Sequence, residues 1–219
     1  MARAFPRPIT CLITGGETNS STAPAGEEFR RLLALVARAI AARVTLVQLR
    51  EKGLTARALF ELASAAAHLA RGSETHVLVN DRADVARASG CDGVHLTTRS
   101  LPAQIVRRAF GEEFVVGVST HSVAEARAAR EGGADFVLFG PVFDTPSKRA
   151  YGPPAGLEAL RETARALAPF PVVALGGVSA ETAAEVLGAG AAGVAGIRLF
   201  ADGQSLARTV HLIERAGRL

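Results

Sequence analysis

Apolar positions along the chain form short continuous runs that alternate with longer stretches of helical spacing. Runs of this length, bounded by turn residues, are typical of strands that are buried on both faces of a sheet. Eight such runs are found, at residues 9–13, 44–49, 76–80, 93–96, 115–119, 136–140, 172–177 and 193–197. The intervening spacing is helical, as in residues 27–42, where Phe29, Leu33 and Val36 fall on one face. The pattern therefore predicts eight strands that alternate with eight helices.

Strands and helices in this alternation predict a parallel sheet with right-handed crossovers. Eight units in 219 residues fit a closed (β/α)8 barrel, or TIM barrel, as a single compact domain spanning 1–219. A doubly wound open sheet is the alternative, but "TGG" after the first strand lacks the full glycine fingerprint of a dinucleotide-binding turn. The low-complexity segment 14–26, "TGGETNSSTAPAG", is expected to be a mobile active-site loop.

Composition and charge exclude some classes of partner. The net charge is +4, yet the sequence has no run of five or more like charges, one Tyr and no Trp, which argues against nucleic-acid binding. No apolar stretch is long enough to span a membrane, and no signal core follows the first residues. Two cysteines do not make a disulfide framework, so the cytoplasm is the expected compartment. A basic protein also suits a small polyanionic substrate.

Polar residues collect directly after the predicted strands. In a (β/α)8 barrel these positions lie on one face and build the active site. The candidates are, in chain order, Gln48, Arg50, Lys52, Asn80, Asp81, Ser119, His121, Thr145, Ser147, Lys148, Gly176 and Gly177.

Each candidate has a structural and a functional interpretation. The arginine and lysines are either solvated strand-end charges or ligands for a phosphate. Asp81 either caps the next helix or offers a hard oxygen to Mg²⁺. His121 is either structural or a general acid–base group, and the Gly176–Gly177 pair is either a tight turn or a phosphate site. Three other histidines, His68, His76 and His211, and His95 inside a strand, are expected to be structural.

Six ordered motifs resemble those of the thiamine phosphate synthase/TenI family. They are "VQLREK", "VNDRADVA", "GVHL", "GVSTHSVAEA", "ADFVLFGPVFDTPSK" and "VVALGGVS". The resemblance implies a (β/α)8 barrel that acts on a phosphorylated thiazole. It also implies that a pyrimidine pyrophosphate is approached by Arg50, Lys52, Asn80, Ser119, Thr145 and Lys148. Gly177 would contact the thiazole phosphate, and Asp81 would be one Mg²⁺ ligand.

The chain departs from the synthase pattern at two places. Synthases typically have a second Mg²⁺-binding Asp after the fourth strand, where this chain has Ser100 preceded by Arg99. Arg198 stands in place of small residues after the eighth strand, where it is able to bind a phosphate without metal. Both changes add positive charge, which disfavours a metal and favours an anion.

The motifs favour a thiazole tautomerase of the TenI branch, an isomerase that needs no metal and in which His121 moves the proton. Thiamine phosphate synthase, a transferase that uses Mg²⁺, is the alternative, and a non-catalytic phosphate-binding barrel is the lesser one. The expected partners are a thiazole phosphate and, for the synthase, a pyrimidine pyrophosphate, without nucleic acid or membrane. The sequence leaves open whether the protein forms a homo-oligomer.

Overall fold

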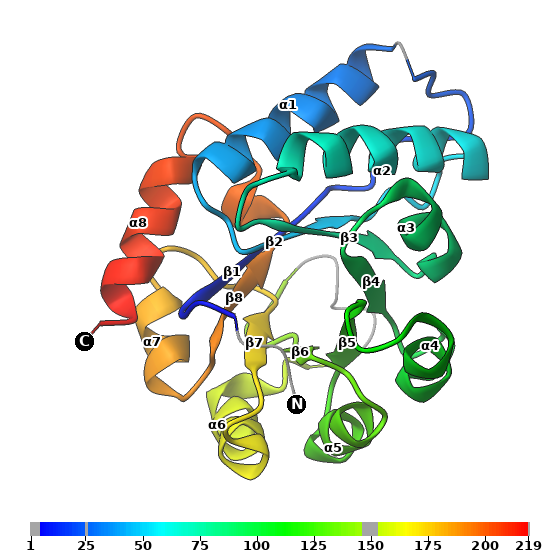
Figure 1. The fold of residues 1–219 in the computed structure, drawn as a ribbon. Helices are drawn as coiled ribbons and strands as arrows, with labels where there is room; N and C mark the ends of the chain where they lie inside the picture. The colour runs from blue at the N-terminus through cyan, green and yellow to red at the C-terminus, as the bar shows by residue number, and fades with distance from the viewer. Residues whose placement is uncertain (1–4, 25, 146–152, 219) are drawn as a thin grey trace.

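The strands close into a parallel barrel surrounded by helices, as the sequence predicts (Figure 1). The computed structural model describes residues 5–24, 26–145 and 153–218. β1 pairs with β2 and with β8, and each remaining strand pairs with its sequence neighbours. The elements are β1 (Ile9–Ile13), α1 (Glu27–Ala41), β2 (Leu46–Leu49), α2 (Ala56–Ala70), β3 (His76–Asn80), α3 (Ala83–Ser89), β4 (Gly93–Leu96), α4 (Ala103–Phe110), β5 (Val115–Thr120), α5 (Val123–Glu131), β6 (Phe136–Phe139), α6 (Gly156–Leu167), β7 (Val172–Leu175), α7 (Ala183–Gly188), β8 (Gly193–Gly196), the 3₁₀ turn η2 (Arg198–Phe200) and α8 (Leu206–Ala216).

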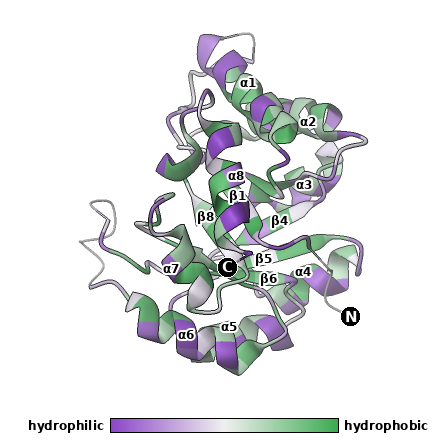
Figure 2. Ribbon diagram, turned by 90° about the vertical axis from the view of Figure 1, so that its left-hand side faces the viewer, coloured by the Kyte–Doolittle hydropathy of each residue, from purple (hydrophilic) through white to green (hydrophobic). Residues whose placement is uncertain are grey.

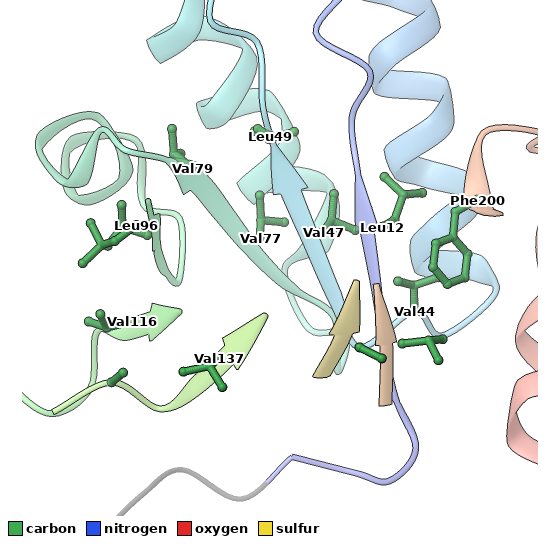
Figure 3. Close-up of a cluster of buried hydrophobic side chains, with 14 of the residues drawn as sticks. Leu12, Val44, Val47, Leu49, Val77, Val79, Leu96, Val116, Val137 and Phe200 are labelled. Carbon is green, nitrogen blue, oxygen red and sulfur yellow. The ribbon is translucent and has the colours of Figure 1, made fainter. Parts of the chain in front are cut away.

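Alternation along the strands divides the core into two layers. Successive side chains of a strand point to opposite faces, so one set packs under the helices and the other fills the barrel. Val47, Val77 and Val137 belong to the outer layer, together with Phe200 from η2 (Figure 3). Ile9, Cys11, Leu46, Leu78 and Phe136 belong to the inner layer. The interior is therefore a packed core, and a site has to lie at one of its ends.

The N-terminal end of the barrel is closed by an aromatic side chain. The Phe5 ring meets His76, at the start of β3, and Phe136, at the start of β6, edge to face at 5.8 Å. This plug leaves the opposite end, where the strands finish, as the open mouth.

Thr55, Ser122 and Ser179 each stand directly before a predicted helix, so the sequence predicts that each of these hydroxyl residues caps one. Thr55 and Ser122 do so, because they accept hydrogen bonds from Ala58 N and Glu125 N. Ser179 instead forms a turn with Thr182, whose hydroxyl accepts from Ser179 N at 2.9 Å. α7 therefore begins only at Ala183.

The helices present polar residues outward around an apolar centre, and Figure 2 shows green strands surrounded by helices of mixed colour. Across the described ranges, no helix combines the length and the apolar composition that a membrane span requires.

Candidate active site

The inward-facing positions near the strand ends carry two hydrogen-bonded polar pairs. Gln48 Nε2 donates to Asn80 Oδ1 at 2.9 Å, and His95 Nε2 lies 2.9 Å from Ser119 Oγ. Each of these side chains is an even number of residues along its strand from one that points into the barrel. Leu46, Leu78 and Val115 are such inner-layer residues. We call Gln48, Asn80, His95 and Ser119 the polar floor, because they replace the apolar core at its boundary with the mouth.

The polar floor has unused hydrogen-bonding capacity. Gln48 Oε1 and His95 Nδ1 are buried without a hydrogen-bond partner among the described residues. Burial lowers the pKa of His95 to about 3, so its imidazole is neutral at physiological pH. Buried polar groups in native proteins are normally paired, so the unpaired atoms at this end of the core indicate a functional role in addition to a structural one.

The buried histidine should make folding sensitive to acid. The unfolded chain takes up a proton near the ordinary histidine pKa of about 6.5, and the folded chain does so only at about 3. Stability is therefore lost as the pH falls through this window, by about 2 kcal/mol of unfolding free energy between about pH 7 and pH 5. Urea unfolding at both pH values measures the loss. His95→Gln should remove this part of it, and equal pH slopes for the two proteins would contradict the expectation.

The end of β2 combines a half-buried arginine and an exposed lysine with a buried carboxylate. Arg50 N donates to Thr14 Oγ1 at 2.8 Å, and a Cβ built on Gly16 would lie 2.9 Å from the Arg50 guanidinium. Glu51 is 3% exposed. Its carboxylate accepts from Gly16 N at 3.1 Å and from Thr18 Oγ1 at 2.7 Å. Lys52 is exposed. The start of the segment 14–26 is thus fastened to the strand that carries the cations, and its mobility stays a prediction.

The residues after β3 and β4 do not form a ready metal site. Asp81 is exposed and has a φ of 62°, and its backbone N donates to His95 O. Ser100 Oγ accepts from Thr97 N at 2.7 Å and lies 3.1 Å from Thr97 Oγ1, so it is committed to its own turn. The described residues contain no group of three or more His, Cys, Asp and Glu side chains that would hold a metal ion. Among the described residues, Asp81 therefore does not belong to a cluster of that kind.

His121 bridges the ends of two neighbouring strands. It follows β5, is exposed, and its Nδ1 lies within hydrogen-bonding distance of the Gly140 carbonyl, directly after β6. A carbonyl only accepts, so the neutral ring bonds through a protonated Nδ1 and has its lone pair on Nε2. Thr145, further along that loop, is 6% exposed. Ser147 and Lys148 lie outside the described residues.

The two glycines after β7 are required by close packing. Gly176 and Gly177 have φ values of 97° and 69°, which other residues rarely adopt. A Cβ on Gly176 would lie 2.6 Å from Pro141, and one on Gly177 would lie 2.6 Å from Phe143 Cβ. This packing supports the tight-turn interpretation, and their contact with a phosphate stays a prediction. The exposed arginines at the mouth, Arg99 after β4 and Arg198 at the start of η2, have no ion pair among those found in the described chain.

Two residues outside the predicted set, His95 and Glu51, lie in contact with predicted site residues or with the loop beside them. His95 was expected to be structural. It stands two positions after Gly93, so its side chain points into the barrel, as those of Gln48 and Asn80 do. This alternation along the strand is the sequence signal that could have indicated its position. Glu51 stands between two basic residues and reads as a surface charge, so nothing local indicated its burial.

Comparisons with known proteins identify the family of the chain. A family model described as thiamine monophosphate synthase, TMP-TENI, matches residues 20–200. The chain belongs to the thiamine monophosphate synthase family. A relative from Geobacter sulfurreducens, named putative thiamine-phosphate synthase, is 49% identical over 166 residues, which cover 76% of this chain and 78% of that protein. The thiamine-phosphate synthase of Roseiflexus sp. is 41% identical over 192 residues, which cover 86% and 80%.

A solved structure of the same family has the same fold. The thiamine phosphate pyrophosphorylase from Pyrococcus furiosus matches 97% of this chain and 96% of its own, with a TM-score of 0.77 and 26% identity. Membership of this family places the chain in thiamine biosynthesis. The relatives' names favour the synthase, which is a transferase, over the tautomerase that the motifs favoured.

Proposed function

We propose that the chain is a thiamine phosphate synthase that joins hydroxymethylpyrimidine pyrophosphate to a thiazole phosphate. The polar floor is the observation that carries the proposal. It sets neutral hydrogen-bonding groups beneath the end of β2, where Arg50 and Lys52 supply positive charge. A substrate with a polar heteroaromatic ring and an anionic tail matches such a site. The names of relatives at 49% and 41% identity support this assignment.

In this reaction one bond breaks and one forms at a single carbon. The bond from the pyrimidine CH₂ carbon to the pyrophosphate oxygen breaks, and the thiazole nitrogen bonds to that carbon. The pyrophosphate leaves with the electron pair, so negative charge grows on it. Groups that bind this charge better in the transition state than in the substrate accelerate the step.

The roles of the residues follow from their chemistry. Arg50 offers a planar fork to the pyrophosphate, and Lys52 and Lys148 offer point charges. Ser119, Thr145 and Ser147 add hydroxyl donors. The Gly176–Gly177 turn and Arg198 are assigned to the thiazole phosphate, and Gln48 with Asn80 to the ring that carries the pyrophosphate. Arg99 supplies a further cation on the side where Ser100 stands.

Metal binding is expected to depend on the ligand. Because Asp81 stands without a second carboxylate at Ser100, the protein alone should bind Mg²⁺ weakly, and substrate oxygens must complete any coordination shell. Titration calorimetry should give a dissociation constant above about 1 mM without pyrophosphate, the range of sites with few charged ligands. Micromolar affinity in the free protein would contradict this expectation, and Asp81→Asn provides the control.

Lys148 should bind the anionic part of the substrate. Lys148→Ala is expected to weaken pyrophosphate binding by about 1.5–3 kcal/mol, the scale of a charge-assisted hydrogen bond, and to leave the unfolding free energy unchanged. Calorimetry with inorganic pyrophosphate measures the first and urea unfolding the second. Arg208→Ala, which removes an exposed cation from α8, is the matched control. Equal affinity in wild type and Lys148→Ala would support the interpretation that Lys148 is a solvated charge and not a phosphate ligand.

The composition of the chain allows an independent check of this site. Lys52 and Lys148 are the two lysines of the sequence. An amine-reactive reagent should label both and the N-terminal amine. Pyrophosphate should slow the labelling of the lysines but not of the terminal amine.

The thiazole tautomerase remains a second candidate because of His121. Its Nδ1 bonds to Gly140 O, which leaves Nε2 as a base on the rim of the mouth. The lesser candidate is a barrel that binds phosphorylated ligands without turnover.

Assays with purified protein separate these functions. The synthase proposal requires thiamine phosphate from the two phosphorylated precursors, and growth of a strain that lacks this enzyme when the chain is supplied. Isomerisation without thiamine phosphate would establish the tautomerase. Binding without either product would establish the non-catalytic barrel. Both free cysteines are buried, which fits the reducing cytoplasm as the proposed compartment.

A further inference from the structure

His95 lies in an environment that offers one of its two nitrogens a partner. Its Nε2 is 2.9 Å from Ser119 Oγ. Its Nδ1 is buried without a partner, and a Cβ built on Gly117 would lie 2.7 Å from it. The Phe136 ring is tilted 34° to the imidazole at 6.0 Å. The side of the ring that carries Nδ1 thus faces an apolar wall.

This asymmetry decides between the two neutral tautomers. With the proton on Nδ1, an N–H group would be buried against the wall without an acceptor, which native structures rarely tolerate. With the proton on Nε2, the N–H group donates to Ser119 Oγ, and an acceptor lone pair rather than an N–H group stays unpaired. The second arrangement leaves the smaller desolvation cost.

We propose that His95 is a positioning residue, held as the Nε2–H tautomer, that donates to Ser119 Oγ and thereby directs the Ser119 proton toward an oxygen of the bound phosphorylated substrate. A hydroxyl that accepts from His95 must point its own hydrogen elsewhere. β5 delivers this hydroxyl at the mouth, in reach of ligands there. The identity of the acceptor rests on the proposed function, but the tautomer does not.

The apolar surroundings keep this arrangement fixed. Burial lowers the pKa of His95 to about 3, so the ring does not become an imidazolium in the working range of an enzyme. A protonated ring would donate from both nitrogens, one of them into the wall. His95 therefore acts by orientation, in contrast to a histidine that exchanges protons during turnover.

Nitrogen NMR of the free protein tests the tautomer directly. We expect His95 to have a protonated Nε2 and an unprotonated Nδ1, unchanged from about pH 5 to pH 9 because of its low pKa. His95→Gln assigns the signal by its loss. Ser119→Ala should shift the Hε2 resonance, since it removes the acceptor. A protonated Nδ1, or titration within this range, would overturn the proposal.

Affinity for inorganic pyrophosphate tests the consequence. Ser119→Ala should weaken binding about tenfold and His95→Gln several-fold, the scale of one hydrogen bond to a charged group. The double variant should bind no worse than Ser119→Ala, because both changes remove the same directed proton. Losses that multiply would refute the coupling. His211→Gln, on the exposed side of α8, is the control and should change neither quantity.

The two assays distinguish this inference from the proposed function. The NMR readout of the wild-type protein stands even where His95→Gln fails to fold. A protein with the expected tautomer and coupling but no thiamine phosphate formation would sink the synthase proposal alone. A normal synthase with a protonated Nδ1 would sink this inference alone.

Discussion

Replacing Asp135 with alanine is expected to lower the free energy of unfolding by about 3–5 kcal/mol, the cost of leaving a buried charge without its partner. Asp135 Oδ2 accepts from Arg107 Nη2 at 2.8 Å and from Val116 N at 2.7 Å. The two side chains are 11% and 7% exposed, for Arg107 and Asp135. The variant leaves the guanidinium uncompensated and one buried N–H of β5 without its acceptor.

The rest of the Arg107 network makes this loss hard to repair. Its guanidinium also donates to the carbonyl oxygens of Gly111, Phe114 and Gly133, which ties the loops before β5 and β6 together. Arg107 cannot turn to solvent without breaking these bonds, so the cost of the unpaired charge stays in the folded state. The pair lies at the N-terminal ends of the strands, away from the mouth, and pyrophosphate affinity should be unchanged.

Denaturant unfolding of two aspartate variants measures the effect. Asp84→Ala is the matched control, because Asp84 pairs with Arg82 at 2.6 Å but is largely exposed, and it should cost about 1 kcal/mol or less. If both variants lose the same free energy of unfolding, burial does not strengthen the effect of removing the aspartate. A loss of pyrophosphate affinity in Asp135→Ala would show that the two ends of the barrel are coupled.

The sequence predicted the fold because its two periodicities are consistent over the whole chain. The runs at 76–80 and 93–96 match β3 and β4 at both ends. Errors lie at the margins, as at residues 44–49, where β2 begins only at Leu46. Apolar content alone does not reveal where ladder hydrogen bonds begin. The Ser179 turn was missed because a hydroxyl that bonds to a neighbouring threonine reads like a helix cap.

The site was predictable in position but not in its contacts. Strand ends in a barrel share one face, which is why Gln48, Asn80 and Ser119 were expected to lie together there. That Gln48 bonds to Asn80 depends on the register between β2 and β3, which no local pattern sets. The burial of Glu51 likewise depends on a distant segment, since its partners Gly16 and Thr18 come from the loop after β1. Roles for the residues at the rim remain predictions.

The reaction itself was the least predictable feature, because two chemistries use one scaffold. The segments "NDR" and "TPSK" resemble those of synthases, whereas His121 and the stretch "LTTRSLPAQIVRRAF" resemble the TenI branch. The names of the relatives favour the synthase. His121 is the residue at which the two hypotheses make opposite demands.

Replacing His121 with asparagine should slow thiazole tautomerisation by about 10²–10⁴-fold, the usual contribution of a general acid–base group. A tautomerase must remove a proton from one atom and return one to another, and an imidazole does both near neutral pH. Asparagine has no group that does this. It does keep an amide N–H able to approach Gly140 O, which now accepts from Nδ1, so the fold should persist.

Thiamine phosphate formation should fall less than about tenfold in the same variant, the scale of one lost hydrogen bond at the rim. Bond breaking at the pyrimidine CH₂ carbon and attack by the thiazole nitrogen need no proton shuttle, so the imidazole has no matching role. Both turnovers are measured with wild type and His121→Asn, and His68→Asn, a change outside the mouth, serves as the control. Isomerisation by wild type that collapses in His121→Asn, with thiamine phosphate absent from both, would reject the synthase. Thiamine phosphate formation in both proteins at similar rates would reject the tautomerase and leave His121 as the link between the ends of β5 and β6.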